Sequence, residues 1–205
     1  MLLLFISCYE DDSRNIQSEN TSHRTSELSL YIKSIASHHA AFDDKIDESS
    51  CFSLQFPYQL YINSELASIT SVQDVSNLNE DDAIEIVYPV NTNFYNYQQH
   101  QANNQSELNL IKNVCTQNFD IISNPCLDFQ FPITIKEFND LTESFETYQL
   151  NNDKELYLHI ENLHDNDVYE IEYPIFLKDS VSNSIRINSN ADFINAFNQF
   201  RQECD

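Results

Sequence analysis

Apolar and polar residues alternate in several short runs of this chain, and stretches with the apolar spacing of a helix follow these runs. In the clearest run, 129–136, aromatic and Ile side chains alternate with polar ones, which is the period of a strand with one buried face. A turn at Asn139–Asp140 and a returning strand over 145–150 come next. A later stretch repeats this order with strands over 168–177 and 184–187. The pattern predicts repeated strand–strand–helix units.

Each of four predicted units contains an aromatic residue followed by Pro in its first strand. The four pairs are Phe56–Pro57, Tyr88–Pro89, Phe131–Pro132 and Tyr173–Pro174. Because Pro cannot donate a hydrogen bond to a sheet ladder, we expect each Pro to face an unpaired edge or a bulge. Chance repetition of a common dipeptide is the alternative, but it does not explain the second shared element that follows every pair.

That second element is a predicted helix start, in which an acid stands three positions after a cap residue. The cap and acid pairs are Ser71 with Asp74, Asn104 with Glu107, Asn152 with Glu155, and Ser189 with Asp192. Such side chains accept hydrogen bonds from the first free N–H groups of a helix and place negative charge at its positive end. The first copy matches the pattern least well.

Three features precede the first unit. The apolar spacing over 26–36 predicts a short helix. The acidic run 43–48 is interpreted as a charged approach to the first strand. Residues 11–24 have the polar composition of a tether that cannot form a core by itself.

Four cysteines bracket the predicted units in pairs. Cys51 opens the first unit and Cys115 closes the helix of the second, whereas Cys126 opens the third and Cys204 closes the helix of the fourth. Of the three connectivities that four cysteines allow, this symmetry selects Cys51 with Cys115 and Cys126 with Cys204. A four-cysteine zinc site is the alternative, although no Cys-x-x-Cys pair is present.

The predicted fold class is therefore α+β, with four strand–strand–helix repeats arranged as two disulfide-stapled modules that contain small antiparallel sheets. The first module spans 51–115 and the second 126–204, with 116–125 as a connector. Closing loops of this size is worth roughly 4 kcal/mol in the chain-entropy account of disulfides. Disulfides also agree with an oxidising compartment such as the cell envelope.

The N-terminus carries a candidate address. An apolar run over Leu2–Ser7 ends at Cys8, and acidic residues follow. This start resembles a bacterial lipoprotein signal, and the acidic residues resemble the surface-export signal of Bacteroidetes lipoproteins. The resemblance implies a signal peptide over 1–7, lipidation of Cys8, and a lipid-anchored place at the outer membrane or cell surface. The tether and the short N-terminal helix would then occupy 8–50. A cytosolic N-terminus with a chance Cys is the alternative, because the run is short and no Lys or Arg precedes it.

Charge and composition exclude several functions. The formal net charge is −23, which would repel nucleic acid phosphates, so we expect no nucleic acid partner. Gly is absent, which removes the Gly-dependent phosphate loops, nucleophile elbow and calcium loop. Asn is expected to occupy the turns instead. The sequence predicts no cofactor and no catalytic residue.

Two acidic loops are weak candidates for a metal site. Asp81 and Asp82 precede the strand of the second unit, and Asp165 and Asp167 precede that of the fourth. Hard carboxylate ligands in equivalent loops could bind calcium weakly. The alternative is a solvated loop that prevents edge pairing.

The remaining candidates are aromatic and His side chains. The six His form no recognised ligand or catalytic spacing, and His159 is expected to be a surface or boundary residue of its helix. Phe94, Tyr95 and Tyr97 could form a hairpin tip that contacts a protein or a glycan. Packing within the second unit is the alternative.

Together, the Cys-x-x-x-Gln-Phe-Pro strands at Cys51 and Cys126, the capped helix starts and the start at Cys8 resemble a group of lipoproteins of flavobacteria and related Bacteroidetes. Members carry strands ending in aromatic–Pro and a turn often built on Asp-Gly, whereas this chain lacks Gly. The resemblance implies a compartment and a repeat, and no catalytic residue. We expect a non-enzymatic binding or structural module of the envelope. The alternatives are an enzyme with a site between the two modules and a weak calcium-dependent module.

Overall fold

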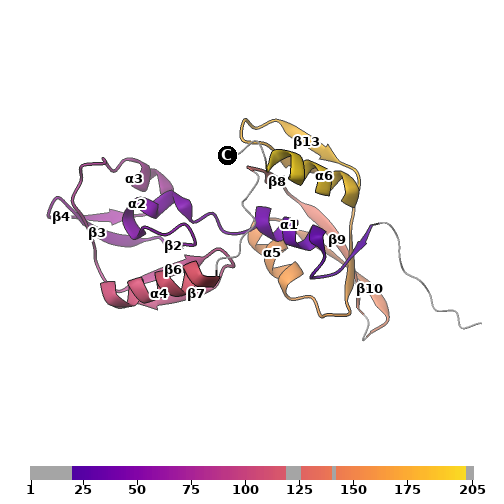
Figure 1. Ribbon diagram of the computed structural model, residues 1–205, viewed down its shortest axis with the longest axis horizontal. Helices are drawn as coiled ribbons and strands as arrows, with labels where there is room; N and C mark the ends of the chain where they lie inside the picture. The colour runs from indigo at the N-terminus through magenta and orange to yellow at the C-terminus, as the bar shows by residue number, and fades with distance from the viewer. Residues whose placement is uncertain (1–19, 119–125, 140–141, 202–205) are drawn as a thin grey trace, which may run out of the picture.

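The computed structural model describes residues 20–118, 126–139 and 142–201, which form a mixed α+β fold with small antiparallel sheets (Figure 1). The strands are β1 (Thr21–Ser22), β2 (Phe52–Leu54), β3 (Tyr58–Ile62), β4 (Glu65–Ile69), β5 (Ile84–Ile86), β6 (Val90–Phe94), β7 (Gln99–Ala102), β8 (Asp128–Gln130), β9 (Ile133–Asn139), β10 (Ser144–Leu150), β11 (Val168–Ile171), β12 (Ile175–Lys178) and β13 (Ser184–Ile187). The helices are α1 (Glu27–Ile35), the 3-10 helix η1 (Ala41–Asp43), α2 (Asp44–Asp47), α3 (Val72–Ser76), α4 (Gln105–Asn118), α5 (Asp153–Glu161) and α6 (Asn190–Phe200).

Each predicted first strand is two strands rather than one. The chain leaves its sheet at the aromatic–Pro pair, whose peptide bond is cis in all four cases. Before Pro132, β8 pairs with β12, whereas β9 after it pairs with β10 and β11. The predictions of continuous strands over 129–136 and 168–177 were therefore wrong. Pro supplies no N–H for a ladder, and the chain changes sheet at that position.

The four sheets of the described residues share one pairing pattern. The β9–β10 hairpin takes β11 as its third strand, while the β12–β13 hairpin takes β8. Earlier in the chain, the β3–β4 hairpin takes β5 and the β6–β7 hairpin takes β2. The exchange is thus mutual within two sets of aromatic–Pro pairs, Pro57 with Pro89 and Pro132 with Pro174. The hairpin that follows one Pro takes its third strand from the residues before the other Pro of its set.

The register of this exchange is the same in every sheet. A residue three positions before one Pro lies opposite the residue three positions after the other Pro. These pairs are Leu54 with Thr92, Leu60 with Ile86, Phe129 with Leu177, and Ile135 with Ile171. All eight side chains are buried, so the shared register places equivalent residues in the interior.

The buried apolar side chains form two separate cores. One core consists of residues within 51–115 and the other joins residues within 127–197 to α1. Figure 1 shows the corresponding two lobes, with α1 lying against α5 and α6 of the orange and yellow lobe. We call residues 41–118 the first lobe, and residues 20–36 with 126–201 the second lobe. The N-terminal segment therefore packs on the part of the chain most distant in sequence.

The helix predicted over 26–36 is confirmed as α1. Ser26 caps it, because its side chain accepts a hydrogen bond from the N–H of Ser29. Leu28 and Ile32 on this helix are buried in the core of the second lobe. Just before it, β1 pairs with β11, so the polar stretch interpreted as a tether ends in a strand.

All four predicted helix starts are confirmed. Each acid reaches back to the backbone N–H of the residue before the cap. These bonds run from Thr70 to Asp74 (2.8 Å), from Asn103 to Glu107 (2.9 Å), from Asn151 to Glu155 (2.7 Å) and from Asn188 to Asp192 (3.1 Å). Each cap side chain in turn accepts from the N–H of its acid residue. Such a cap is worth about 1 kcal/mol.

The predicted pairing of Cys51 with Cys115 is confirmed by a disulfide in the first lobe. Cys126 is also disulfide-bonded. Cys204, its predicted partner, lies outside the described residues, as does Cys8.

The acidic run 43–48, interpreted as a charged approach to the first repeat, forms the end of η1 and α2. Lys45 and Glu48 are exposed, whereas Asp43 and Asp47 are buried. The N–H of Leu54 in β2 donates to Oδ2 of Asp43 over 2.8 Å. Part of this charged run is therefore inside the lobe, where a carboxylate accepts a strand N–H.

Tyr97 joins the two lobes. Its hydroxyl donates to the carbonyl oxygen of Ala36 over 2.8 Å, and its ring centroid lies 5.6 Å from that of Tyr157 on α5. Phe94, by contrast, is buried in the core of the first lobe. Phe94 thus packs inside the first lobe and Tyr97 packs against the other lobe rather than its own unit, whereas Tyr95 is half-buried and lines a cavity beside α4.

Candidate functional site

Several titratable side chains line a cleft of about 460 Å³ between α5 and the β9–β10 hairpin. We call it the α5 cleft. Glu137 of β9 and Tyr148 of β10 line one side, and His159 of α5 lines the other. Strand alternation turns these two hairpin side chains toward α5, and the cap at Asn152 fixes where that helix begins.

Glu137 and His159 meet at the floor of the α5 cleft. Nε2 of His159 lies 3.3 Å from Oε2 of Glu137, and only 13% and 12% of the two side chains is exposed. The contact is not aligned as a hydrogen bond, and Nε2 of His159 is buried without a hydrogen-bond partner among the described residues. The pair therefore retains unused donor or acceptor capacity inside a cleft.

Burial disfavours the charged form of each member of this pair. It raises the pKa of Glu137, and the nearby carboxylates of Asp167 and Glu146 raise that pKa further. Burial also lowers the pKa of His159. Glu137 and Glu155 are the acids that line the cleft, and no Lys or Arg is among the lining residues to balance them.

Glu146 adds to this imbalance from the neighbouring strand. It lies directly opposite Glu137 in the β9–β10 register, where like charges repel. The hydroxyl of Tyr148 donates to the carboxylate of Glu146 and holds it beside the cleft. A cation placed between these strands would relieve the repulsion, which an anion would increase.

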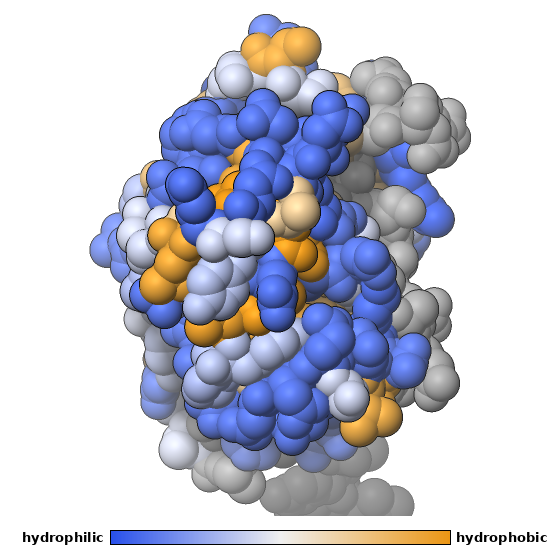
Figure 2. Space-filling model, turned by 90° about the vertical axis from the view of Figure 1, so that its left-hand side faces the viewer, coloured by the Kyte–Doolittle hydropathy of each residue, from blue (hydrophilic) through white to orange (hydrophobic). Residues whose placement is uncertain are grey.

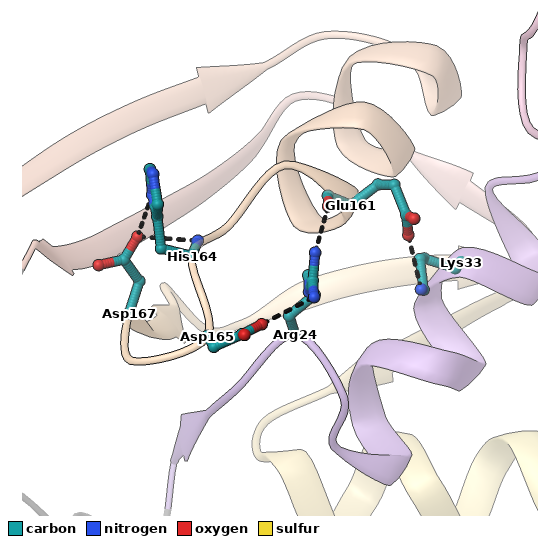
Figure 3. Close-up of polar contacts among 6 residues, drawn as sticks. All are labelled: Arg24, Lys33, Glu161, His164, Asp165 and Asp167. Atoms are coloured by element: carbon teal, nitrogen blue, oxygen red, sulfur yellow. Dashed lines mark hydrogen bonds and ion pairs between the residues drawn. The ribbon is translucent and has the colours of Figure 1, made fainter.

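The loop that follows α5 contributes His164 to the lining of the cleft, and Figure 3 shows the polar contacts of this loop. Oδ2 of Asp167 accepts from the backbone N–H of His164 over 3.0 Å and lies 3.1 Å from Nδ1 of the same residue. Asp165 forms an ion pair with Arg24 of the N-terminal segment, at 2.7 Å. These two acids, the later pair of calcium candidates, thus already have protein partners.

Figure 3 also shows how the N-terminal segment holds this region. Lys33 of α1 lies 2.8 Å from Oε2 of Glu161, the last residue of α5, and Arg24 donates to the carbonyl oxygen of Glu161. Arg24 and Lys33 therefore fasten the end of α5 from outside, and neither lines the cleft.

The earlier calcium candidates, Asp81 and Asp82, lie in the corresponding loop of the first lobe. Oδ2 of Asp82 accepts from the N–H of Asn79 over 2.8 Å, and Oδ1 accepts from the side chain of Asn63 over 2.8 Å. Asp81 is exposed. Asp82 and Asp167 each stand seven residues before a Pro, and each accepts the N–H three residues earlier, which indicates a turn-forming role.

A second cavity occupies the corresponding place in the first lobe. It measures about 410 Å³ and lies between α4 and the β6–β7 hairpin, and we call it the α4 groove. Phe94 and Ile111 line it where Glu137 and His159 line the α5 cleft. Phe94 and Glu137 each follow their Pro by five residues, and Ile111 and His159 each follow their cap by seven. The same location is apolar in one lobe and acidic in the other.

A buried acidic pair lies elsewhere in the first lobe. Burial raises the pKa of Asp43 to about 7 and that of Asp47 to about 9, and the Asp43 carboxylate contributes to the effect on Asp47. Oδ1 of Asp43, Oδ2 of Asp47 and the Tyr58 hydroxyl are buried without hydrogen-bond partners among the described residues. This pair lies inside the lobe rather than in a cavity, so it bears on stability more than on binding.

The outer end of the first lobe carries a small apolar pair. Tyr61 of β3 and Leu66 of β4 lie opposite each other and are 42% and 55% exposed. Figure 2 shows hydrophobic side chains near the middle of this end, surrounded by hydrophilic ones. Scattered apolar side chains of this kind are common on protein surfaces and do not assign a site.

Sequence reasoning missed the pair of Glu137 and His159, although one signal for it was present. Glu137 has the same strand parity as Ile133 and Ile135, so the alternation places an acid on the buried face. His159 was expected at a surface or boundary position, and it is a boundary residue: it has intermediate burial and lines the cleft. Its proximity to Glu137 depends on how α5 packs on the sheet, which spacing along the chain does not encode.

Within residues 20–118, 126–139 and 142–201, no three His, Cys, Asp or Glu side chains are arranged so that they could hold a metal ion. No helix in these ranges combines the length and the apolar character needed to cross a membrane. The chain matches no protein-family model, and no curated protein and no solved structure is significantly similar to it.

Proposed function

We propose that this protein is a non-enzymatic binding module of the cell envelope, anchored by a lipid at Cys8, which binds a partner protein through the free edge of β10. The anchor rests on the lipoprotein-like start, in which an apolar run ends at Cys8. Labelling of cells with a palmitate analogue should modify the wild-type chain and leave Cys8→Ser unlabelled. Equal labelling of the two, or no labelling, would contradict the anchor.

The observation that carries the binding role is the edge strand β10. It is seven residues long and is the last strand of the sheet ordered β1-β11-β9-β10, so among the described strands it pairs only with β9. Residues 144–147 are exposed, and Phe145 is 58% exposed. A strand of this length offers main-chain donors and acceptors to an extended peptide.

The sequence of β10 protects this edge by one charged residue alone, Glu146. Natural sheet edges are commonly blocked by Lys, by Pro or by a bulge. β10 reads Ser-Phe-Glu-Thr-Tyr-Gln-Leu and contains neither Lys nor Pro, and its ladder with β9 is unbroken over all seven residues. The exposed aromatic side chain of Phe145 gains more from contact with an added strand than from exposure to water, which favours recognition of another strand at this edge.

A photo-crosslinking amino acid at position 145 tests this role in intact cells. The lipidated protein should crosslink to an envelope protein from this position. The matched control is the same amino acid at position 181, because Val181 is 74% exposed and lies in the turn between β12 and β13. Equal products from both positions, or none from 145, would contradict binding at β10.

We also propose that the chain is built from four strand–strand–helix repeats, paired as modules over 51–115 and 126–204. The shared register of strand exchange, the four equivalent caps and the two cores support this proposal. Mass spectrometry of the non-reduced chain should find Cys51 linked to Cys115 and Cys126 linked to Cys204. Any other linkage of Cys204 would contradict the second module.

A further inference from the structure

We propose that the α5 cleft receives a basic side chain, Lys or Arg, from an extended peptide that pairs with the edge of β10. This inference rests on the proposed function of that edge and adds a preference for one class of side chain. It concerns the juxtaposition of a free strand edge with an acidic cleft beside it.

The first support is the state of Glu137. Its residue is only 9% exposed, and its carboxylate receives no hydrogen bond from another described residue, although Nε2 of His159 lies 3.3 Å away. A carboxylate that is largely removed from water and has no aligned donor is stabilised by a cation or by hydrogen bonds from a ligand. An ammonium or guanidinium group would supply both.

The second support is the sign of the charges around the cleft. Glu146 from β10 and Asp167 from the loop before β11 act electrostatically on Glu137, and Glu155 at the start of α5 lines the same cleft. His164 opposes them only in its protonated form, and no Lys or Arg is among the lining residues. The field therefore selects cations over anions.

The third support is the wall of the cleft. The rings of Tyr148 and His159 pack with their centroids 4.6 Å apart, and Leu158 and Leu163 complete an apolar lining. Lys and Arg side chains bury their methylene stems along such surfaces while the charged head reaches a polar group. An aromatic wall additionally stabilises a cation.

The geometry of strand addition brings the two features together. Neighbouring strands are about 4.8 Å apart, so a peptide beside β10 would lie one spacing from Glu146 and two from Glu137. Every second side chain of that peptide would face the side of the sheet on which Tyr148 and Leu150 line the cleft. A long basic side chain at one such position spans the distance to the carboxylates.

The α4 groove supplies an internal comparison. Phe94 and Ile111 occupy the positions of Glu137 and His159, and no carboxylate lines this groove. A basic side chain gains no ionic partner there, so the preference should be confined to the second lobe.

The test uses three nine-residue peptides of alternating Thr and Val that differ only at the central cleft-facing position, which is Lys, norleucine or Glu. They are titrated into the full oxidised chain labelled with ¹⁵N, and amide shifts are followed by NMR. The Lys peptide should shift amides of β10 and α5 and bind at least about tenfold more tightly than the norleucine peptide, which corresponds to one charge-assisted contact.

Glu137→Gln should reduce the Lys preference to about twofold or less and leave norleucine affinity unchanged, because only the ionic contact is removed. Glu85→Gln, which removes one exposed charge from β5 in the first lobe, should keep the full preference. If Glu137→Gln fails to give a wild-type amide spectrum, Glu146→Gln at the exposed edge takes its place and should lower the preference severalfold.

The outcomes separate the two proposals. Equal binding of the Lys and norleucine peptides at β10 would overturn the basic preference and leave the edge as a binding site. Tighter binding of the Glu peptide would overturn it as well. Shifts confined to other strands, or no binding by any peptide, would overturn both the preference and the proposed role of β10.

Discussion

The α4 groove and the α5 cleft lie at the same place in the two lobes, between a β-hairpin and the helix that follows it, yet their chemistry differs. Phe94 and Ile111 make the first apolar, and Glu137 and His159 make the second acidic and buried. The backbone around both is set by the same register and the same helix caps. The comparison teaches that Pro, cap and alternating apolar positions determine the fold, while a few positions between them are free to change the chemistry.

The two lobes also handle buried acids differently. Asp43 and Asp47 lie inside the first lobe, where burial raises both pKa values. The second lobe buries Asp167, which caps the turn at His164, and Glu137, which faces a cavity that a ligand can enter. The first arrangement affects stability alone, whereas the second is open to binding.

The largest difference between the lobes should follow from removing the first disulfide. Cys51 and Cys115 are 64 residues apart, and the chain-entropy relation gives about 4 kcal/mol for a loop of this size. The double variant Cys51→Ala with Cys115→Ala should lower the unfolding free energy of the first lobe by that amount. Native-state hydrogen exchange measures this for α4 and α5 separately. An equal loss of protection in both helices would contradict independent lobes.

The next effect should come from Tyr97, which connects the lobes. Tyr97→Ala removes a partly buried ring from the second core and its hydrogen bond to Ala36, at a cost of about 2 kcal/mol. Thermal unfolding should show this loss, and small-angle scattering should show a more variable distance between lobes. Tyr97→Phe is the control, because it keeps the ring and should lose only about 1 kcal/mol.

The third effect in size should be a dependence of the unfolding free energy on pH, which we expect in the first lobe. The folded pKa of Asp47 is raised from 3.8 to about 9, so this group favours the folded state at low pH and that contribution is lost as pH rises between those values. Between pH 7.5 and 8.5 the first lobe should lose up to about 1.4 kcal/mol. Denaturant titrations at both values measure the slope. In Asp47→Asn the slope should flatten, and an unchanged slope would exclude Asp47 as its source.

The smallest effect should come from equivalent helix caps. Ser71 and Ser189 begin α3 and α6 with the same side-chain hydrogen bond to the backbone. Ser71→Ala and Ser189→Ala should each cost about 1 kcal/mol, measured by denaturation. The corresponding Gly variants, which cost only a few tenths of a kcal/mol, serve as controls. A loss in one lobe without a similar loss in the other would weaken the proposed equivalence of the units.

Local features of this fold could be predicted from the sequence because they depend on neighbouring residues. The cap at Ser189 and the strand over 184–187 need only a few consecutive side chains, and both are confirmed. The pairing of Cys51 with Cys115 followed from the symmetry of the units. The helix over 26–36 was likewise visible in its spacing.

The features that could not be predicted depend on contacts between distant segments. The change of sheet at Pro132 is decided by the pairing of β8 with β12, about forty-five residues later in the chain. The packing of α1 on α5 and α6 is similarly non-local. For the candidate site, the alternation of side chains along the strand could place Glu137 on the buried face. The closeness of His159 to Glu137 could not be predicted, because it depends on the angle at which α5 crosses the sheet.

Hydrogen exchange of the full oxidised chain, with and without the Lys peptide described above, measures whether β10 and the α5 cleft bind together. We expect slower exchange of β10 amides and of amides in α5 around His159, with no change in β6, β7 or α4. Protection of the α4 groove, or unchanged exchange along β10 at a saturating peptide concentration, would contradict this expectation.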